Sequence, residues 1–271
     1  NQHKLSKPFV DAIRAVSIDR DSIAITYGRV DLPPGFREDL FGPATASEEV
    51  LASTRAQMNN LIAVIGRSPD TQPSFGMCFE TVFILARERS VDRDPVTENR
   101  AGIFALGILL GHRRIEEFLG PVSPNGNNRA TRRAFRRVTL RGRSDWTKHF
   151  CVSAAIAILS DEVVSDAAGL LKEELDADIG GSGFSFADLL ADRAGTVFAV
   201  RATQDKISAH AMQVRLSRGF LVDEFFPPAA DLPEGIPDAE LQSRYGGVGG
   251  QAYNRLIDEM EQRIDSCAAY R

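Results

Sequence analysis

Long apolar runs are missing from this chain of 271 residues. The two most apolar stretches, Ala101–Leu110 and Cys151–Leu159, are shorter than the roughly 18 to 20 residues that a membrane-spanning helix needs, so no transmembrane segment is expected. Cysteine is scarce as well, and Cys78, Cys151 and Cys267 lack the close spacing of a metal site. They allow at most one disulfide, for which Cys78 with Cys267 is the pairing considered in an oxidising compartment. Cys151 lies inside an apolar run, which predicts a small buried residue.

A strong excess of one charge is also missing, because the chain carries a net charge of -5 at pH 7. We therefore expect no general attraction of the whole molecule to nucleic acid. One local basic stretch runs from Arg129 to Lys148, with Asp145 as its single acid. It predicts either peripheral contact with phosphates or anionic lipid head groups, or a solvated helix face that pairs with acids elsewhere. Its aromatic residues are only Phe135 and Trp146, too few for a base-stacking platform, so sequence-specific nucleic-acid binding is not expected.

Apolar residues at helical spacing dominate the rest of the chain. In the segment 46–67, for example, Val50, Met58 and Leu61 fall on one face of a helix. The segment Ser22–Val30 is rich in β-branched residues and predicts one short strand. Helices are expected over residues 46–67, 75–87, 98–110, 112–119, 145–159, 162–177, 185–201, 205–218 and 251–267. The prediction is a mainly α, soluble, multi-helix globular fold with a small β element near the N-terminus.

Two loops made of turn-forming residues, 121–128 and 227–237, divide the chain into three regions. Residues 1–120 form an N-terminal helical region with the short strand, residues 129–226 a second helical region, and residues 238–271 a C-terminal helix. The length and the 43% hydrophobic content are sufficient for a real core. We expect the three regions to pack as one integrated domain.

Polar residues gather in one segment, Asp145–Arg201, in a regular pattern. His149 opens an apolar helix. Glu173 and Asp176 are three residues apart on a second expected helix, and Asp188 and Asp192 are four apart on a third, so each pair shares a helix face. The loop between the last two helices contains Gly180, Gly181 and Gly183, and at least one of the last two is expected at positive φ.

This order of residues resembles the pattern of small bacterial envelope lipoproteins and, more distantly, that of the VanZ-like membrane family. The resemblance is confined to residues 145–202, and its matching positions are Asp145, Lys148, His149, Gly169, Lys172, Glu173, Asp176, Gly183, Ser185, Asp188, Leu189, Asp192 and Gly195. It implies a bacterial envelope setting, periplasmic or secreted, rather than a particular reaction. In VanZ-like proteins these segments lie in membrane helices, whereas polar residues at 160–162 interrupt the apolar run here.

Three kinds of site are compatible with these side chains. A divalent metal is one, with mixed nitrogen and oxygen ligands from His149, Glu173, Asp176, Asp188 and Asp192. Acid–base catalysis is the second, with His149, Glu173 and Asp188 as catalytic candidates and crowded carboxylates that raise one pKa. Ligand binding without catalysis is the third, with Lys148, Lys172 and Ser185 as further contacts. The structural alternative is that the same groups are helix caps and buried ion pairs, with Ser185 or Asp188 capping its helix.

The function expected from these observations is that of a binding or accessory protein of the bacterial cell envelope with an undefined ligand. The first alternative is a metal-assisted hydrolase centred on His149 and the paired acids, with a divalent metal as its cofactor. The second is a structural subunit of a larger assembly, which would use the basic stretch and the C-terminal helix as contact surfaces. An envelope component or another protein is the expected partner in the accessory role.

Overall fold

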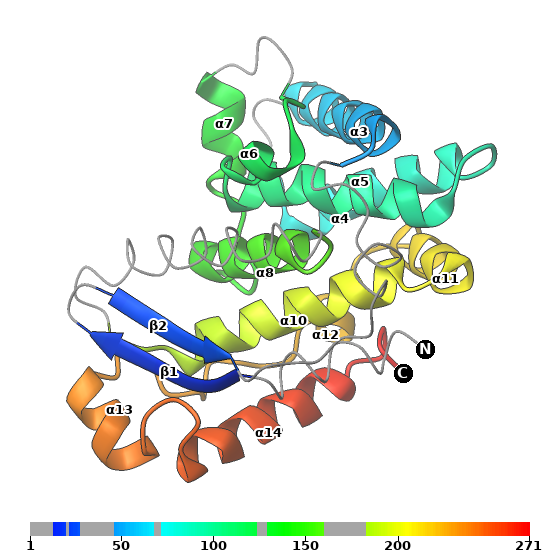
Figure 1. Cartoon of the computed structure of the whole chain (residues 1–271). Helices are drawn as coiled ribbons and strands as arrows, with labels where there is room; N and C mark the ends of the chain where they lie inside the picture. The colour runs from blue at the N-terminus through cyan, green and yellow to red at the C-terminus, as the bar shows by residue number, and fades with distance from the viewer. Residues whose placement is uncertain (1–12, 20–21, 28–45, 68–71, 124–128, 160–182) are drawn as a thin grey trace, which may run out of the picture.

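A computed structural model of the chain describes residues 13–19, 22–27, 46–67, 72–123, 129–159 and 183–271 (Figure 1). Within these ranges the protein is mainly helical, as the periodicity predicted. The helices are α3 (Glu48–Gly66), α4 (Phe75–Arg89), α5 (Pro95–Leu106), η2 (Gly107–Gly111), α6 (Ile115–Leu119), α7 (Arg129–Phe135), α8 (Ser144–Ile156), α10 (Phe186–Thr203), α11 (Lys206–Leu216), α12 (Val222–Phe225), α13 (Asp238–Tyr245) and α14 (Gln251–Asp265). None of these described helices has the length and apolar character to cross a bilayer.

The small β element near the N-terminus is a two-stranded antiparallel hairpin. Its second strand, β2 (Ser22–Tyr27), lies within the segment predicted to be a strand. Its first strand, β1 (Ile13–Asp19), was not expected, and it pairs with β2 through partners such as Val16 with Ile25. The strand prediction was therefore correct in place but gave only half of the hairpin.

Short polar side chains cap the starts of five helices. The N-cap oxygen accepts a hydrogen bond from the backbone N–H three residues later, which satisfies one of the donors that a first helical turn leaves free. These caps are Ser47 at α3, Ser74 at α4, Asp94 at α5, Ser185 at α10 and Asp205 at α11. Local sequence therefore determines where these five helices begin.

The helix predicted over residues 98–110 differs from the structure at both ends. α5 begins earlier, because Asp94 caps it and Pro95 occupies its first turn. After Leu106 the chain widens into the π-helical turn η2. A Cβ on Gly107 would lie 2.6 Å from the Cβ of Ala155, so close packing against α8 accompanies this change of helix type.

The C-terminal region is also different from its prediction, since residues 238–271 contain two helices instead of one. α13 ends at Gly246, which adopts a left-handed conformation with a φ of 76°. Gly247 and Gly249 also have positive φ, so the chain turns before α14 begins. The short helices α7 and α12 were not predicted either, because neither is long enough to show apolar periodicity.

One hydrophobic core joins residues from α3 to the C-terminal end of the chain. α10 lies at its centre, packed against α8 on one side and contacting α14 on the other (Figure 1). Phenylalanine rings fill much of the space, and Phe79, Phe150 and Phe198 are within ring-contact distance of one another. The three cysteines are buried and free, so the Cys78–Cys267 disulfide considered above is absent, and Cys151 is a small buried residue as predicted.

Candidate functional site

The helices α8 and α10 place a histidine between two aspartates. His149 of α8 is buried, with 5% of its surface exposed. Its Nδ1 lies 3.2 Å from Oδ1 of Asp192, and its Nε2 lies 4.0 Å from Oδ2 of Asp188. Since a carboxylate only accepts hydrogen bonds, Nδ1 donates to Asp192, while the contact with Asp188 has the length of an ion pair. These three side chains of the predicted motif therefore lie together, and they are named here the His149–Asp188–Asp192 cluster.

A glycine brings the two helices close enough for these contacts. A Cβ built on Gly195 of α10 would lie 2.1 Å from the carbonyl oxygen of Phe150, which follows His149 in α8. No side chain fits in that space, so only glycine permits this approach of the two backbones. Asp192 precedes Gly195 by three residues, on a neighbouring position of the same helix face. The close approach thus places the Asp192 carboxylate beside the ring of His149.

Ser153 completes the inner part of the cluster. It follows His149 by four residues, which puts both side chains on the same face of α8. Its hydroxyl donates a hydrogen bond of 2.7 Å to Oδ1 of Asp192, the oxygen that also faces His149. Asp192 is therefore held by two groups of one helix, and the orientation of the imidazole is fixed in turn.

Asp188 is less well satisfied than Asp192. Its Oδ1 is buried and has no hydrogen-bond partner among the described residues, although an arginine nitrogen of Arg143 lies 4.0 Å away. Burial raises the pKa of Asp188 above its usual value of 3.8, and the field of His149 opposes this in part. The acids Asp145 and Glu234 raise the same pKa further. The carboxyl group of Asp188 therefore has one oxygen without a hydrogen-bond donor in the described part of the chain. Its raised pKa also favours the protonated form.

Arg143 links the cluster to the surface. Its guanidinium donates to both carboxylate oxygens of Asp145, with the shortest contact at 2.5 Å, and to Glu234 at 3.1 Å. The ion pair with Asp145, followed by that with Glu234, raises the pKa of Arg143, so this side chain stays charged. Glu234 comes from a distant loop, which the backbone bridge between Phe184 and Ile236 holds against the start of α10.

The other residues predicted for the site divide into two groups. Lys172, Glu173 and Asp176 lie outside the described residues, as does the helix predicted over 162–177. Ser185 accepts a hydrogen bond of 3.1 Å from the N–H of Asp188 and is the N-cap of α10, the structural role that the sequence offered as an alternative. Lys148 is half-buried and takes no part in the interactions that hold the cluster.

Two further predictions concern the glycine loop and the metal. Gly183 has a φ of 74°, which confirms the prediction of a positive φ at Gly181 or Gly183, while Gly181 lies outside the described residues. Among the described residues, no group of three or more His, Cys, Asp or Glu side chains is arranged to hold a metal ion. A metal site that also uses Glu173 or Asp176 stays a prediction.

Sequence reasoning did not single out Ser153, Arg143 or Glu234. The i, i+4 spacing of His149 and Ser153 is a signal from which Ser153 could have been found. Arg143 was counted only as one member of the basic stretch. Glu234 has no local signal, because its place beside Arg143 depends on a contact between residues 91 positions apart.

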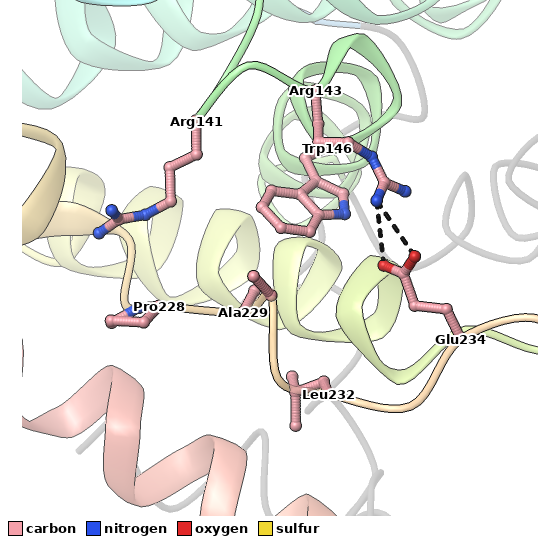
Figure 2. A pocket seen from close by; sticks show the side chains of 8 residues that line it. Arg141, Arg143, Trp146, Pro228, Ala229, Leu232 and Glu234 are labelled. Atoms are coloured by element: carbon pink, nitrogen blue, oxygen red, sulfur yellow. Dashed lines mark hydrogen bonds and ion pairs between the residues drawn. The ribbon is translucent and has the colours of Figure 1, made fainter.

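A pocket of about 420 Å³ lies next to the cluster (Figure 2). Its polar wall consists of Arg141, Arg143, Trp146 and Glu234, and its apolar wall is the loop 228–232. Neither His149 nor the two aspartates line it, so Arg143 is the side chain that borders both the pocket and the cluster.

The chemistry available at the cluster follows from these contacts. An imidazole fixed by one carboxylate and facing a second can bind a hydrogen-bonding group or transfer a proton. No protein-family model, curated protein or solved structure matches the chain, so the assignment of a function depends on the residues themselves.

Proposed function

We propose that this chain is a ligand-binding accessory protein of the bacterial cell envelope, with the His149–Asp188–Asp192 cluster as its recognition centre. The ligand is a small molecule that donates hydrogen bonds through hydroxyl or ammonium groups. Asp188 accepts from the ligand, and Asp192 holds His149 in position beside it. In the complex, a donor group of the ligand forms a hydrogen bond with the carboxyl oxygen of Asp188 that has no donor among the described residues of the ligand-free protein.

One observation carries this proposal, the buried Oδ1 of Asp188 without a hydrogen-bond donor among the described residues. An unsatisfied buried acceptor costs roughly 1 to 3 kcal/mol, more for a charged group, and most buried polar groups in proteins are paired. Two acids, Asp145 and Glu234, add negative potential at the same carboxyl. A donor with a partial or full positive charge relieves both effects.

The envelope setting is supported by the resemblance of residues 145–202 to bacterial envelope lipoproteins. The basic stretch adds a means of peripheral contact with an anionic surface. Its side chains Arg132, Arg133, Arg136 and Arg137 are exposed. Within the described chain no carboxylate lies in ion-pair distance of these four. Fractionation of the native bacterium tests the location, and recovery of the chain only from the cytosolic fraction would contradict it.

A binding experiment with matched probes tests the recognition centre. Ethanolamine offers ammonium and hydroxyl donors, whereas 1,2-dimethoxyethane only accepts hydrogen bonds. We expect ethanolamine at millimolar concentration to shift the NMR signals of His149 and of the start of α10, and the diether to leave them unchanged. Asp188→Asn removes the negative charge and one of the two acceptor oxygens while keeping the shape of the side chain, and should weaken ethanolamine binding by about tenfold or more.

The control for this experiment is Asp265→Asn, which removes an exposed acid at the end of α14. It should bind ethanolamine like the parent protein. Equal shifts with both probes, or equal binding by Asp188→Asn and the parent, would contradict the assignment of Asp188 as the acceptor.

A second candidate function is acid–base catalysis, in the form of a hydrolase. The raised pKa of Asp188 beside an imidazole that Asp192 orients is the specific observation in its favour. A metal-assisted version needs ligands beyond the described cluster, from Glu173 or Asp176. Metal analysis of the purified protein, with melting curves of Glu173→Gln in the presence and absence of divalent ions, tests that version. A metal-free protein whose melting does not respond to divalent ions would exclude it.

A further inference from the structure

The pocket beside the cluster has a wall built on an unusual turn. Leu140 and Arg143 exchange two backbone hydrogen bonds of 3.0 Å, and Arg141 and Gly142 between them have φ values of 51° and 82°. Two central residues with positive φ define a type I′ turn, for which Asn-Gly is the preferred pair. Arg141 is the one described residue other than glycine with a positive φ. For a residue with a side chain, this left-handed backbone conformation is higher in energy than the right-handed helical or extended ones. Such conformations concentrate at functional sites.

Both arginines of the turn line the pocket, and in the view of Figure 2 their guanidinium groups lie on either side of the Trp146 ring. Arg141 donates to Asp223 at 2.5 Å and to the carbonyl oxygen of Phe226 at 2.7 Å. The side chain of Asp223 is 86% exposed, so water competes strongly for this ion pair and a ligand can replace it. Arg143 stacks over the indole of Trp146, with its guanidinium carbon 4.8 Å from the ring centroid.

Trp146 contributes a hydrogen-bond donor that nothing in the described chain accepts. The residue is only 3% exposed, and its Nε1 is buried without a partner. Figure 2 shows this nitrogen on the edge of the ring that is turned toward Arg143 and Glu234. Buried indole nitrogens usually donate a hydrogen bond to an acceptor, and the described part of the pocket wall offers none to Nε1 of Trp146.

These groups together define the chemistry of an occupant. The pocket lining contains two cations and one acid, Glu234, and its unsatisfied group is a donor. Arg143 is already paired with Asp145 and Glu234, whereas the carboxylate on Arg141 is that of the exposed Asp223. An occupant that takes the place of Asp223 therefore has to bring acceptors and negative charge. The opposite wall, Pro228, Ala229 and Leu232, is apolar and favours a hydrophobic body. A volume of about 420 Å³ suits a small organic molecule.

We propose that the pocket between the 140–143 turn and the 228–234 loop binds a small organic carboxylate with a planar apolar body. The carboxylate takes the place of Asp223 on Arg141, whose planar guanidinium matches it in geometry. The apolar body packs between the Trp146 ring and the loop, where an acceptor on the ligand also reaches the indole nitrogen. This inference does not depend on the proposed function, because neither His149 nor Asp188 lines the pocket.

Trp146 makes the test direct, because it is the only tryptophan in the chain. Benzoate is the probe, benzamide its neutral control of the same shape, and sodium chloride the control for ionic strength. We expect benzoate to change the tryptophan emission of the full chain saturably. Benzamide and chloride should produce no comparable change at the same concentrations.

Arg141→Asn is the decisive variant, since it creates the Asn-Gly pair that a type I′ turn prefers and therefore retains the fold. It should melt at the parent temperature or above, while benzoate affinity falls by about tenfold or more. Arg141→Lys keeps the charge without the planar fork and should give an intermediate affinity. Arg137→Asn, at an exposed arginine outside the pocket, should bind benzoate like the parent.

Other results would overturn the proposal. An equal response to benzamide would show that the pocket does not select charge, and an equal response to chloride would show a general salt effect. Unchanged benzoate affinity in Arg141→Asn would place the binding elsewhere. No emission change with benzoate in the parent protein would remove the assignment of a carboxylate ligand.

Discussion

Asp188 and Asp192 are the same residue type, one helical turn apart, yet their surroundings differ. Asp192 accepts hydrogen bonds from His149 and Ser153, so its charge is well solvated by the protein. Asp188 has a buried oxygen without a donor among the described residues, and burial raises its pKa. The difference gives the two carboxyl groups separate tasks, one that orients the imidazole and one that is available to a ligand or a proton.

The raised pKa of Asp188 has a consequence for the pH dependence of stability. A carboxyl whose folded-state pKa exceeds its unfolded value binds its proton more tightly in the native state. The contribution of this carboxyl group to the stability of the fold is fully present below its unfolded-state pKa, near 3.8. It is lost as the pH rises through the raised folded-state pKa. Asp188→Asn should therefore increase the free energy of unfolding at neutral pH, by less than about 1 kcal/mol because solvent screens this partly exposed group.

Urea denaturation of Asp188→Asn and the parent across this pH range measures the effect. The gain in the variant should shrink toward zero as the pH falls toward 3.8. A gain that stays constant with pH would mean that charge is not its cause. Asp265→Asn, at an exposed position, should show no such trend.

At the scale of elements, the contact between α8 and α10 determines the site. Gly195 lets the α10 backbone touch the carbonyl of Phe150. On the other side of α8, Gly107 and Gly111 of η2 pack against Ala155 and Val152. Glycines on both sides hold α8 in close contact with its neighbours, so His149 has little freedom to move away from the aspartates.

Gly195→Ala tests this contact. The new Cβ would lie 2.1 Å from a backbone oxygen, which cannot rotate away as a flexible side chain would. We expect α8 and α10 to separate slightly, at a cost of about 2 kcal/mol or more in the free energy of unfolding. The NMR signals of His149 should shift at the same time, because the hydrogen bond to Asp192 lengthens.

Gly66→Ala is the matched control, since no atom lies within 4 Å of the position that the new methyl group would take at the end of α3. There the loss of backbone freedom in the unfolded chain should stabilise the protein, by up to about 1 kcal/mol. If Gly195→Ala changed the free energy of unfolding no more than Gly66→Ala does, α8 and α10 would separate without an energetic cost.

At the scale of the molecule, buried polar contacts tie distant segments together. Glu98 of α5 is fully buried and bonds to Ser53 of α3 at 2.9 Å and to Arg89 of α4 at 2.8 Å. Gln213 of α11 donates to Asn99 at 2.8 Å in the same way. Removal of one partner from such a buried set leaves the others unsatisfied, so these contacts favour a single arrangement of the helices.

The loop before α10 makes a similar long-range connection and supports a test. Gly183 combines a φ of 74° with a close approach, since a Cβ there would lie 2.7 Å from backbone atoms of Gly235 and Ile236. Gly249 has a φ of 83° but no atom within 4 Å of its Cβ position. Both alanine variants should be strained by the left-handed backbone, at roughly 1 kcal/mol. Because of its additional backbone clash, Gly183→Ala should lower the free energy of unfolding by about 1 kcal/mol more than Gly249→Ala does, as measured by thermal or urea unfolding.

The same comparison checks the place of Glu234. Separation of the 183–184 and 235–236 backbones should weaken the ion pair between Glu234 and Arg143. If Gly183→Ala and Gly249→Ala lowered the free energy of unfolding equally, the bridge between Phe184 and Ile236 would not constrain the loop that carries Glu234.

The sequence by itself determined the features that depend on residues within one helical turn. The caps Ser47 and Ser185, the apolar periodicity of the long helices, and the shared face of Asp188 and Asp192 all follow from spacings of three or four residues. A positive φ in the glycine loop was predicted from its turn-forming residues, and Gly183 has it. These local preferences were sufficient to predict the helical class and most of the helix boundaries.

Only the tertiary structure decided which faces meet and at what distance. Nothing near Gly195 in the sequence indicates that it touches Phe150, and nothing near Glu234 indicates Arg143 as its partner. The π-helical turn at Gly107–Gly111 depends in the same way on the neighbouring α8. Such contacts join residues tens of positions apart, and their free energy comes from packing and desolvation that exist only once the helices are assembled.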